Sequence, residues 1–78
     1  MKIKELSYVP TYSLFVRFED GVEGQINLEQ LVEKGIFQPL KNTELFSKAY
    51  ATTNAIAWSD ELEIDAIAVH MELSKRRD

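Results

Sequence analysis

The chain has one histidine, His70, which is the residue with the widest chemical range. An imidazole can act as a general base or as a metal ligand near neutral pH. Nucleophilic catalysis would need a cysteine or a serine in a fitting context beside it, and the chain has no cysteine. Asp65, Val69 and Ser74 are neighbours of His70 only through helical spacing. Because these residues assemble no catalytic constellation, we expect a surface or boundary histidine in a protein that is not an enzyme.

A run of carboxylates precedes this histidine: Asp60, Glu61, Glu63 and Asp65. Calcium loops hold oxygen ligands at set spacings and use a glycine for the sharp turn. Here Leu62 and Ile64 alternate with the acids and no glycine is present, so a strand end or loop with its acids in water is favoured over a weak cation site. The alternative with a functional meaning is an acidic patch, including Asp60 and Glu61, that steers a basic partner.

Two aromatic residues, Phe37 and Trp58, are best suited to anchor a protein partner, because aromatic side chains dominate interface energetics. The alternative is that both rings belong to the core of a small domain. Exposure of either ring would mark an interface. The candidate partner-binding residues are therefore Phe37, Trp58, Asp60 and Glu61. We expect no cofactor and no metal, since the glycines at 21, 24 and 35 form no phosphate-binding pattern.

Composition limits the class of protein. A length of 78 residues predicts one domain, 1–78, and the 45% hydrophobic content is sufficient for a globular core. So short a chain buries only ~60% of the surface of its unfolded form, so pairing with another chain would add stability. The sequence has no signal-peptide pattern and no long apolar run, which predicts a cytoplasmic protein with no membrane partner.

The formal net charge of −4 argues against non-specific nucleic-acid binding, which depends on neutralising phosphates with Lys and Arg. The basic cluster is Lys75-Arg76-Arg77. Its residues are either cations favoured by the dipole at a helix C-terminus or a tail that contacts phosphates. An acidic surface suits a basic protein partner better than DNA or an anionic membrane.

Residues 12–27 predict two strands joined by a tight turn, because hydrophobic and polar residues alternate along both. A loop of residues 19–21 pairs Phe18 with Val22 and keeps one face apolar, whereas a two-residue loop would set Phe18 against Glu23. Gly21 is the residue that can adopt the left-handed conformation of this turn. Opposite Val16, Gly24 leaves a thin spot where a bulge, a helix or a partner could approach.

An earlier strand, residues 2–9, completes a three-stranded antiparallel meander after the turn at Pro10. The preferred register places Tyr8 opposite Leu14 and Leu6 opposite Val16. It also places Glu5 across from Arg17, so opposite charges meet.

The rest of the chain predicts short elements. A two-turn helix is expected over residues 27–34, capped by Asn27 and ended by Gly35, followed by an extended connector at 37–40. A second helix is expected over 43–48, capped by Asn42 with Leu45 and Phe46 turned inward. Strands are expected at 50–53 and 55–58, with a break at 59–61.

The last helix is expected to begin after Asp65 as its N-cap. Its predicted apolar side carries Ile67, Met71 and Ser74, widened by Val69 and Leu73.

These motifs occur in an order that resembles one known family. They are Phe18-Glu19-Asp20-Gly21, then Gly35-Ile36-Phe37 with Leu40, and a late Ile56-Ala57-Trp58. In this order, over nearly the whole chain, the sequence resembles the bacterial domain of unknown function 2442. One departure is Ala66-Ile67-Ala68-Val69-His70, where that family is expected to carry a Leu-Tyr pair.

The resemblance implies a small α+β domain that is not an enzyme and binds a protein. Members of the family occur alone or ahead of a helix-turn-helix domain, often encoded beside a small toxin-like protein. The implied function is an antitoxin-like partner of a small basic, toxin-like protein. The alternative is a component of a nucleic-acid-associated transcriptional regulator, for which this chain has no room for a helix-turn-helix extension.

The predicted fold class is α+β, with an antiparallel sheet of four to five strands in the order β-β-β-α-α-β-β-α. The short helices are expected to pack on one face of that sheet. Open sheet edges also make a homodimer one of the expected assemblies.

Overall fold

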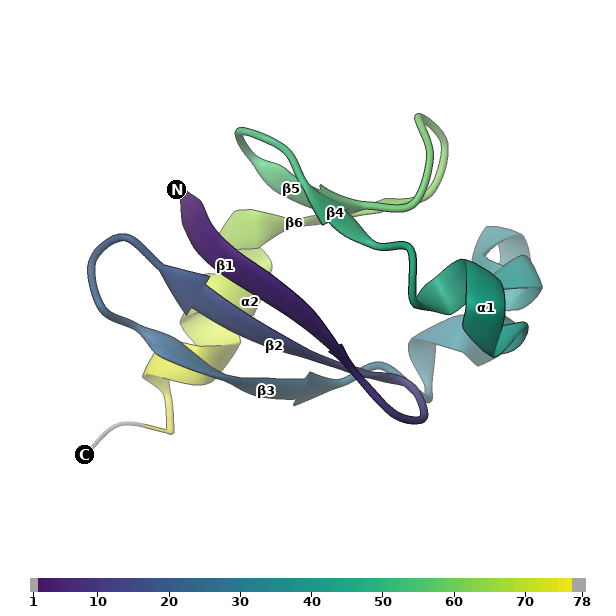
Figure 1. Ribbon diagram of the computed structural model, residues 1–78, viewed down its shortest axis with the longest axis horizontal. Coiled ribbons are helices and arrows are strands. Elements are labelled where there is room, and N and C mark those ends of the chain that lie inside the picture. The colour runs from purple at the N-terminus through teal and green to yellow at the C-terminus, as the bar shows by residue number, and fades with distance from the viewer. Residues whose placement is uncertain (1, 77–78) are drawn as a thin grey trace.

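The computed structural model describes residues 2–76 and has an α+β fold with two small sheets (Figure 1). The first sheet has the order β1-β2-β3, formed by β1 (Ile3–Val9), β2 (Ser13–Phe18) and β3 (Glu23–Asn27). The second has the order β4-β5-β6, formed by β4 (Tyr50–Ala51), β5 (Ala55–Ala57) and β6 (Glu63–Asp65). The helical elements are η1 (Leu31–Glu33), η2 (Gly35–Lys41), α1 (Thr43–Phe46) and α2 (Ala66–Ser74).

The expectation of one sheet with four to five strands is wrong in detail, because the later strands form a separate sheet. The extra strand is β6, in a stretch whose carboxylates predicted a strand end or loop. Ile64 pairs with Ile56, so this alternating segment supplies one apolar residue to the sheet while Glu63 and Asp65 stay exposed. The strands of the second sheet are only two or three residues long and pair with their chain neighbours, while β4 passes near β1 (Figure 1).

The predicted meander of the first sheet is confirmed in its register. The Phe18 amide donates to the Val22 carbonyl at 2.8 Å, so residues 19–21 form the loop. Gly21 has φ +93°, the left-handed conformation that the turn requires. Between β1 and β2, Tyr8 pairs with Leu14, Leu6 with Val16 and Glu5 with Arg17, as predicted. The register shifts only between Ile3 and Glu5.

The thin spot at Gly24 is filled by a helix, which was one of the three possibilities expected there, beside a bulge and a partner. A Cβ built on Gly24 would lie 2.8 Å from Cδ2 of Leu73. Leu73 belongs to α2, which crosses one face of the first sheet (Figure 1). The missing side chain of Gly24 therefore sets how closely the helix and the sheet approach.

The helix expected over residues 27–34 is wrong. The Asn27 carboxamide accepts from the Glu29 amide at 2.8 Å, which makes a local turn in place of a helix cap. Only the short 3₁₀ element η1 follows, and Lys34 is extended (φ −98°, ψ 125°). A two-turn helix has too few hydrogen bonds to offset the cost of nucleation, so packing decides its conformation.

The extended connector expected at 37–40 is also wrong, because it lies within the 3₁₀ helix η2. Gly35 has a positive φ of +34°, as expected, but it begins η2 and does not end an α-helix. Pro39 lies inside η2, where the preset φ of proline fits a helical turn.

The next helix, α1, is confirmed with its cap but is shorter than expected. The Asn42 carboxamide accepts from the amides of Glu44 and Leu45 at 2.9 and 3.4 Å. Phe46 is buried, whereas Leu45 is 44% exposed, which corrects the expectation that both turn inward. Adjacent helical residues lie about 100° apart around the axis, so one of the two must face outward.

The last helix, α2, begins as predicted, since the Asp65 carboxylate accepts from the Ile67 amide at 2.9 Å. Its predicted apolar side is confirmed for Val69 and Leu73 but wrong in its centre, which was placed on Ile67, Met71 and Ser74. The buried residues are Ala66, Val69 and Leu73, while Ile67 and Met71 are exposed. Because α2 follows β6 directly, the position of the second sheet fixes which side of the helix meets the core.

The core lies between the first sheet, α2, the second sheet and α1. Its largest fully buried side chains are Phe18, Phe46, Leu14, Leu40, Ile56, Leu73, Val16 and Val32. Within the described part of the chain, no helix has both the length and the apolar character needed to cross a membrane.

Candidate functional site

A small groove lies where η2 and α1 meet the β5–β6 loop. It has a volume of about 190 Å³ and is lined by Pro39, Leu40, Leu45, Lys48, Trp58, Ser59 and Leu62. The hydrophobic members come from the consecutive elements η2 and α1 and from the β5–β6 loop, which follows later in the chain. The groove is therefore a product of the tertiary structure.

Trp58 forms the fixed wall of this groove. Its indole Nε1 donates to the backbone carbonyl of Phe46 at 2.9 Å, and its ring centroid lies 5.6 Å from that of Phe46. On another side the ring meets Phe37 edge-on, at 6.5 Å between centroids. Both aromatic residues are partly buried and pack against the core. Each predicted anchor thus contributes to the core and still presents part of its surface.

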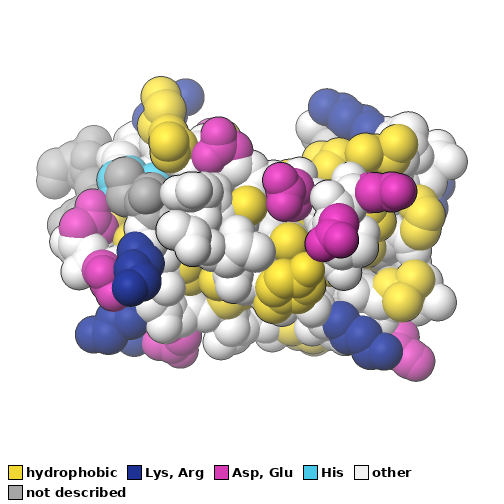
Figure 2. All heavy atoms as spheres, turned by 90° about the horizontal axis from the view of Figure 1, so that it is seen from above, with side chains coloured by type: hydrophobic (Ala, Val, Ile, Leu, Met, Phe, Trp, Pro, Cys, Tyr) yellow, Lys and Arg dark blue, Asp and Glu magenta, His cyan; other side chains and the backbone are white. Residues whose placement is uncertain are grey.

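The two predicted acidic residues belong to the loop that supplies one wall of the groove. Asp60 and Glu61 are exposed and lie between two lining residues, Ser59 and Leu62. The loop is held by the Trp58 amide, which donates to the Leu62 carbonyl at 2.8 Å, and by the Ser59 hydroxyl, which accepts from the Glu61 amide at 3.3 Å. Figure 2, viewed from the side of this loop, shows acidic side chains next to hydrophobic ones at the end that carries α1.

The structure therefore brings Phe37, Trp58, Asp60 and Glu61 into one region. A volume of about 190 Å³ is below the roughly 300–1,000 Å³ of small-molecule sites, so the groove has room for a side chain of a larger partner. A hollow of about 630 Å³ beside the β4–β5 turn is lined mainly by polar residues. With Ala55 as its one hydrophobic lining residue, it offers less apolar surface for a partner to bury.

Sequence reasoning missed three lining residues of the groove, the hydrophobic Leu45 and Leu62 and the basic Lys48. Leu45 could have been found from the helical angle between it and its buried neighbour Phe46. Leu62 and Lys48 carry no such signal, because only the packing of the β5–β6 loop against α1 places them together.

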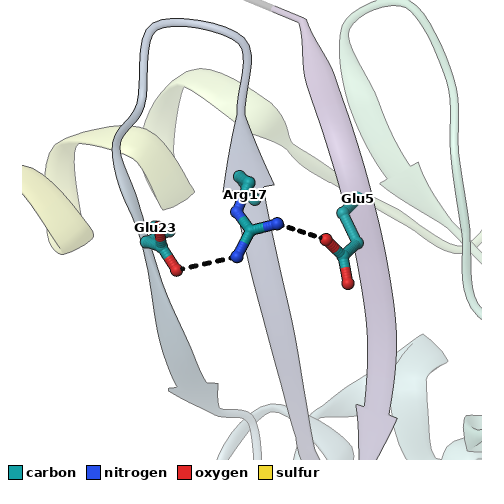
Figure 3. Close-up of polar contacts among 3 residues, drawn as sticks. All are labelled: Glu5, Arg17 and Glu23. Carbon is teal, nitrogen blue, oxygen red and sulfur yellow. Dashed lines mark hydrogen bonds and ion pairs between the residues drawn. The ribbon is translucent and has the colours of Figure 1, made fainter.

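A second charged cluster covers the other face of the first sheet, around Arg17 (Figure 3). Its guanidinium donates to Glu5 at 2.6 Å and to Glu23 at 3.2 Å. The hydrogen bond and charge of Glu23, and then the charge of Glu5, raise the pKa of Arg17. Arg17 also lies over the ring of Phe15, 5.4 Å from its centroid. Because Arg17, Glu5 and Glu23 pair with one another, this cluster attracts a charged partner less strongly than Asp60 and Glu61 do.

His70 is mostly buried at the boundary of the core, in agreement with the expected boundary histidine. Its Nε2 lies 2.7 Å from Oδ2 of Asp20, in the β2–β3 turn, and its ring meets Phe18 edge-on at 4.8 Å. The Ser74 hydroxyl lies 3.4 Å from Nδ1. The contact with Asp20 spans 50 residues and could not be read from the sequence.

These three polar groups are of the types found in hydrolytic triads, but their surroundings favour a structural role. Ser74 lies in the last turn of α2, where the helix presents carbonyl oxygens and not the amide donors that an oxyanion requires. His70 therefore ties α2 to the β2–β3 turn. Among residues 2–76, no group of three or more His, Asp or Glu side chains could hold a metal ion.

The basic cluster lies partly outside the described residues, which end before Arg77. Arg76 donates to the Gln25 carbonyl at 2.6 Å and lies 3.6 Å from the Glu72 carboxylate. Its guanidinium is thus engaged by the protein's own acceptors on β3 and α2.

Comparison with known proteins gives a family and no characterised relative. The family model described as "Protein of unknown function (DUF2442)" matches residues 3–70. No curated protein matches the chain, and no solved structure matches it.

Proposed function

This chain belongs to the DUF2442 family of proteins of unknown function, and from that premise we propose that it is a non-enzymatic domain that binds a basic protein. The observation that carries the proposal is the groove beside Trp58, with Asp60 and Glu61 on its border. An apolar recess next to unpaired surface charge is typical of a site for one anchoring side chain with complementary charges around it.

The contacts of Trp58 support this role. A binding anchor loses less conformational entropy when it is already held in place before the partner arrives. Trp58 is held by its bond to the Phe46 carbonyl and by the rings of Phe46 and Phe37. Leu45, which also lines the groove, is 44% exposed, so a partner that covers it removes apolar surface from water.

The charge of the chain supports a basic partner. The net charge is −4, and the β5–β6 loop carries two exposed carboxylates beside the groove. The negative electrostatic potential of these carboxylates speeds the association of a cationic protein and slows that of an anionic one. In the cell, we propose, the domain acts like an antitoxin that binds a small basic, toxin-like protein. A cytoplasmic location is part of the same proposal.

The alternative proposal is a component of a nucleic-acid-associated regulator, for which Lys75 and Arg76 would supply the phosphate contacts. The engagement of Arg76 with Gln25 and Glu72 weighs against it. A titration of labelled duplex DNA at low salt separates the two proposals, because phosphate binding must weaken steeply as salt rises.

The test is a selection from a library of random displayed peptides, with the protein as bait. We expect enrichment of peptides in which one bulky apolar residue is flanked by Lys or Arg. The variant Leu45→Asp, which puts a charge into the groove from a partly exposed position, should lose these peptides. Ile67→Asp, the same change at an exposed site on α2, is the matched control and should keep them.

A second pair of variants tests the acidic border. Asp60→Lys with Glu61→Lys should remove the preference for Lys and Arg, and the control Glu19→Lys with Glu29→Lys, which changes the net charge equally at other exposed sites, should preserve it. Peptides that show no basic preference, or that bind Leu45→Asp as well as the wild type, would refute the proposed site.

A further inference from the structure

The helix α2 is apolar on the side that faces water as well as on the side that faces the core. Ala66, Val69 and Leu73 are buried. On the opposite side Ile67 is 53% exposed and Met71 is 58% exposed. Large apolar side chains on two opposite sides of a helix indicate that both sides are covered, and here the described chain covers only one; the polar residues of α2 are His70, Glu72 and Ser74.

The exposed apolar stripe is continuous along the helix. Ile67 and Met71 are four residues apart, so they lie one turn above the other on the same face. Ala68, also exposed, borders them and has no bulk to keep a second helix away. Figure 2 shows hydrophobic side chains projecting from the edge of the molecule beside the histidine.

Charges of opposite sign stand at the two ends of this stripe. Exposed Glu63 and Asp65 lie at the N-terminal end of α2. Exposed Lys75 lies at its C-terminal end, beside Arg76, whose guanidinium already contacts Glu72 and the Gln25 carbonyl. A basic partner would be repelled by one end and attracted by the other. A second α2 in the antiparallel direction would meet opposite charge at both ends, and the two helix dipoles would also be antiparallel.

We propose that the occupant of this stripe is a second copy of the chain, paired through antiparallel α2 helices about a twofold axis. The axis crosses the exposed face of α2 at the level of residue 69, midway between Ile67 and Met71, so Ile67 of each copy packs against the partner's Met71. This contact is isologous, because the same patch serves both copies. It is separate from the Trp58 groove and does not depend on the proposed function.

The small size of the exposed apolar stripe limits the affinity of the proposed dimer. Nine residues of α2 span about 14 Å, since an α-helix rises about 1.5 Å per residue. A contact of that length falls in the class of small, transient interfaces. The dimer should therefore form and dissociate with concentration.

The first measurement is the mass in solution by sedimentation equilibrium, from about 10 µM to 1 mM. The wild type should move from 9.0 kDa toward 18 kDa, which is twice 9.0 kDa. Ile67→Asp and Met71→Lys should each remain at the lower mass, and circular dichroism should show that both variants stay folded. Leu45→Asp, an equivalent change in the groove, should dimerise like the wild type.

The register is tested by mixing the two variants. In the proposed pairing, Asp at position 67 of one copy meets Lys at position 71 of the other, while Met71 and Ile67 still pack together at the second contact. An equimolar mixture should therefore dimerise although neither variant does so alone. A wild type that stays monomeric, variants that still dimerise, or a mixture without rescue would each overturn the proposal.

Discussion

Leu73 of α2 occupies the space where a side chain at position 24 of β3 would lie, 2.8 Å from the position of a Cβ on Gly24. Leu73 is 1% exposed, so the leucine has no room to retreat. We expect Gly24→Ala to destabilise the fold by about 1 kcal/mol and Gly24→Val by about 2–3 kcal/mol, the range for overpacked cores. Urea unfolding measures both changes.

A compensating variant provides the control for that prediction. Leu73→Ala alone should destabilise by roughly 2–5 kcal/mol through the cavity it leaves. Combined with Gly24→Val, the loss should be smaller than the sum of the two single losses, because the added methyl groups enter the vacated space. Strict additivity would show that residues 24 and 73 do not share this space.

The turn at Gly21 should tolerate only residues that accept a left-handed backbone. Its φ is +93°, and nothing lies within 4 Å of an added Cβ, so the penalty is conformational and not steric. We expect Gly21→Ala to cost about 1–2 kcal/mol. Gly21→Asn should cost less, since asparagine is the residue after glycine that tolerates this region. Equal losses for the two variants in thermal unfolding would contradict the explanation.

Trp58→Phe should destabilise the fold, because it removes the indole hydrogen bond and part of the buried ring. The variant keeps an aromatic ring at position 58, and the Phe46 carbonyl keeps the Ala49 amide, at 3.3 Å, as its remaining donor. The expected loss is about 0.5–1.5 kcal/mol for the hydrogen bond, with a further loss from the packing of the smaller ring. Denaturant unfolding followed by circular dichroism measures it, because the fluorescent side chain is absent from the variant. A neutral substitution would mean that water replaces the donor.

The contact between His70 and Asp20 should protect the β2–β3 turn. His70→Phe keeps a ring against Phe18 but removes the bond to Asp20 at 2.7 Å. We expect faster hydrogen exchange at the Gly21 and Val22 amides and a loss of about 0.5–1.5 kcal/mol. Exchange in the β4–β5 turn should be unchanged and serves as the internal control.

The Arg17 cluster should respond to salt but not to moderate alkali. Because the pKa of Arg17 is raised by Glu23 and Glu5, its contribution is present below the ordinary pKa of arginine and is lost only as pH rises through the raised value. The difference in melting temperature between wild type and Arg17→Gln should therefore be the same at about pH 7 and pH 10. It should shrink at about 1 M salt, since the side chain is exposed.

Much of the first sheet could be predicted because its determinants are local. The alternation of Leu14, Val16 and Phe18, together with one glycine in the turn, leaves a single register that keeps the apolar face whole. The helix caps at Asn42 and Asp65 could also be predicted from the sequence, because each side chain accepts a hydrogen bond from an amide two or three residues away. Neighbouring residues favour such caps, although at Asn27 the same side chain makes a local turn and no helix follows.

For the candidate site, some of the residues could be predicted from the sequence, but their arrangement in space could not. Trp58, Phe37 and the acidic pair could be selected by residue type, and the structure brings them into one region. Their arrangement depends on α1 meeting the β5–β6 loop, where Leu45 and Leu62 complete the groove. No spacing in the sequence encodes that meeting.

The sequence by itself determined the meander, the Gly21 turn and the starts of α1 and α2, because these depend on contacts between near neighbours. The tertiary structure alone decided that residues 31–33 and 35–41 form 3₁₀ helices, that the later strands form a second sheet, and that α2 presents Ile67 and Met71 to water. Short segments have several local conformations of nearly equal free energy, and burial against distant residues selects among them.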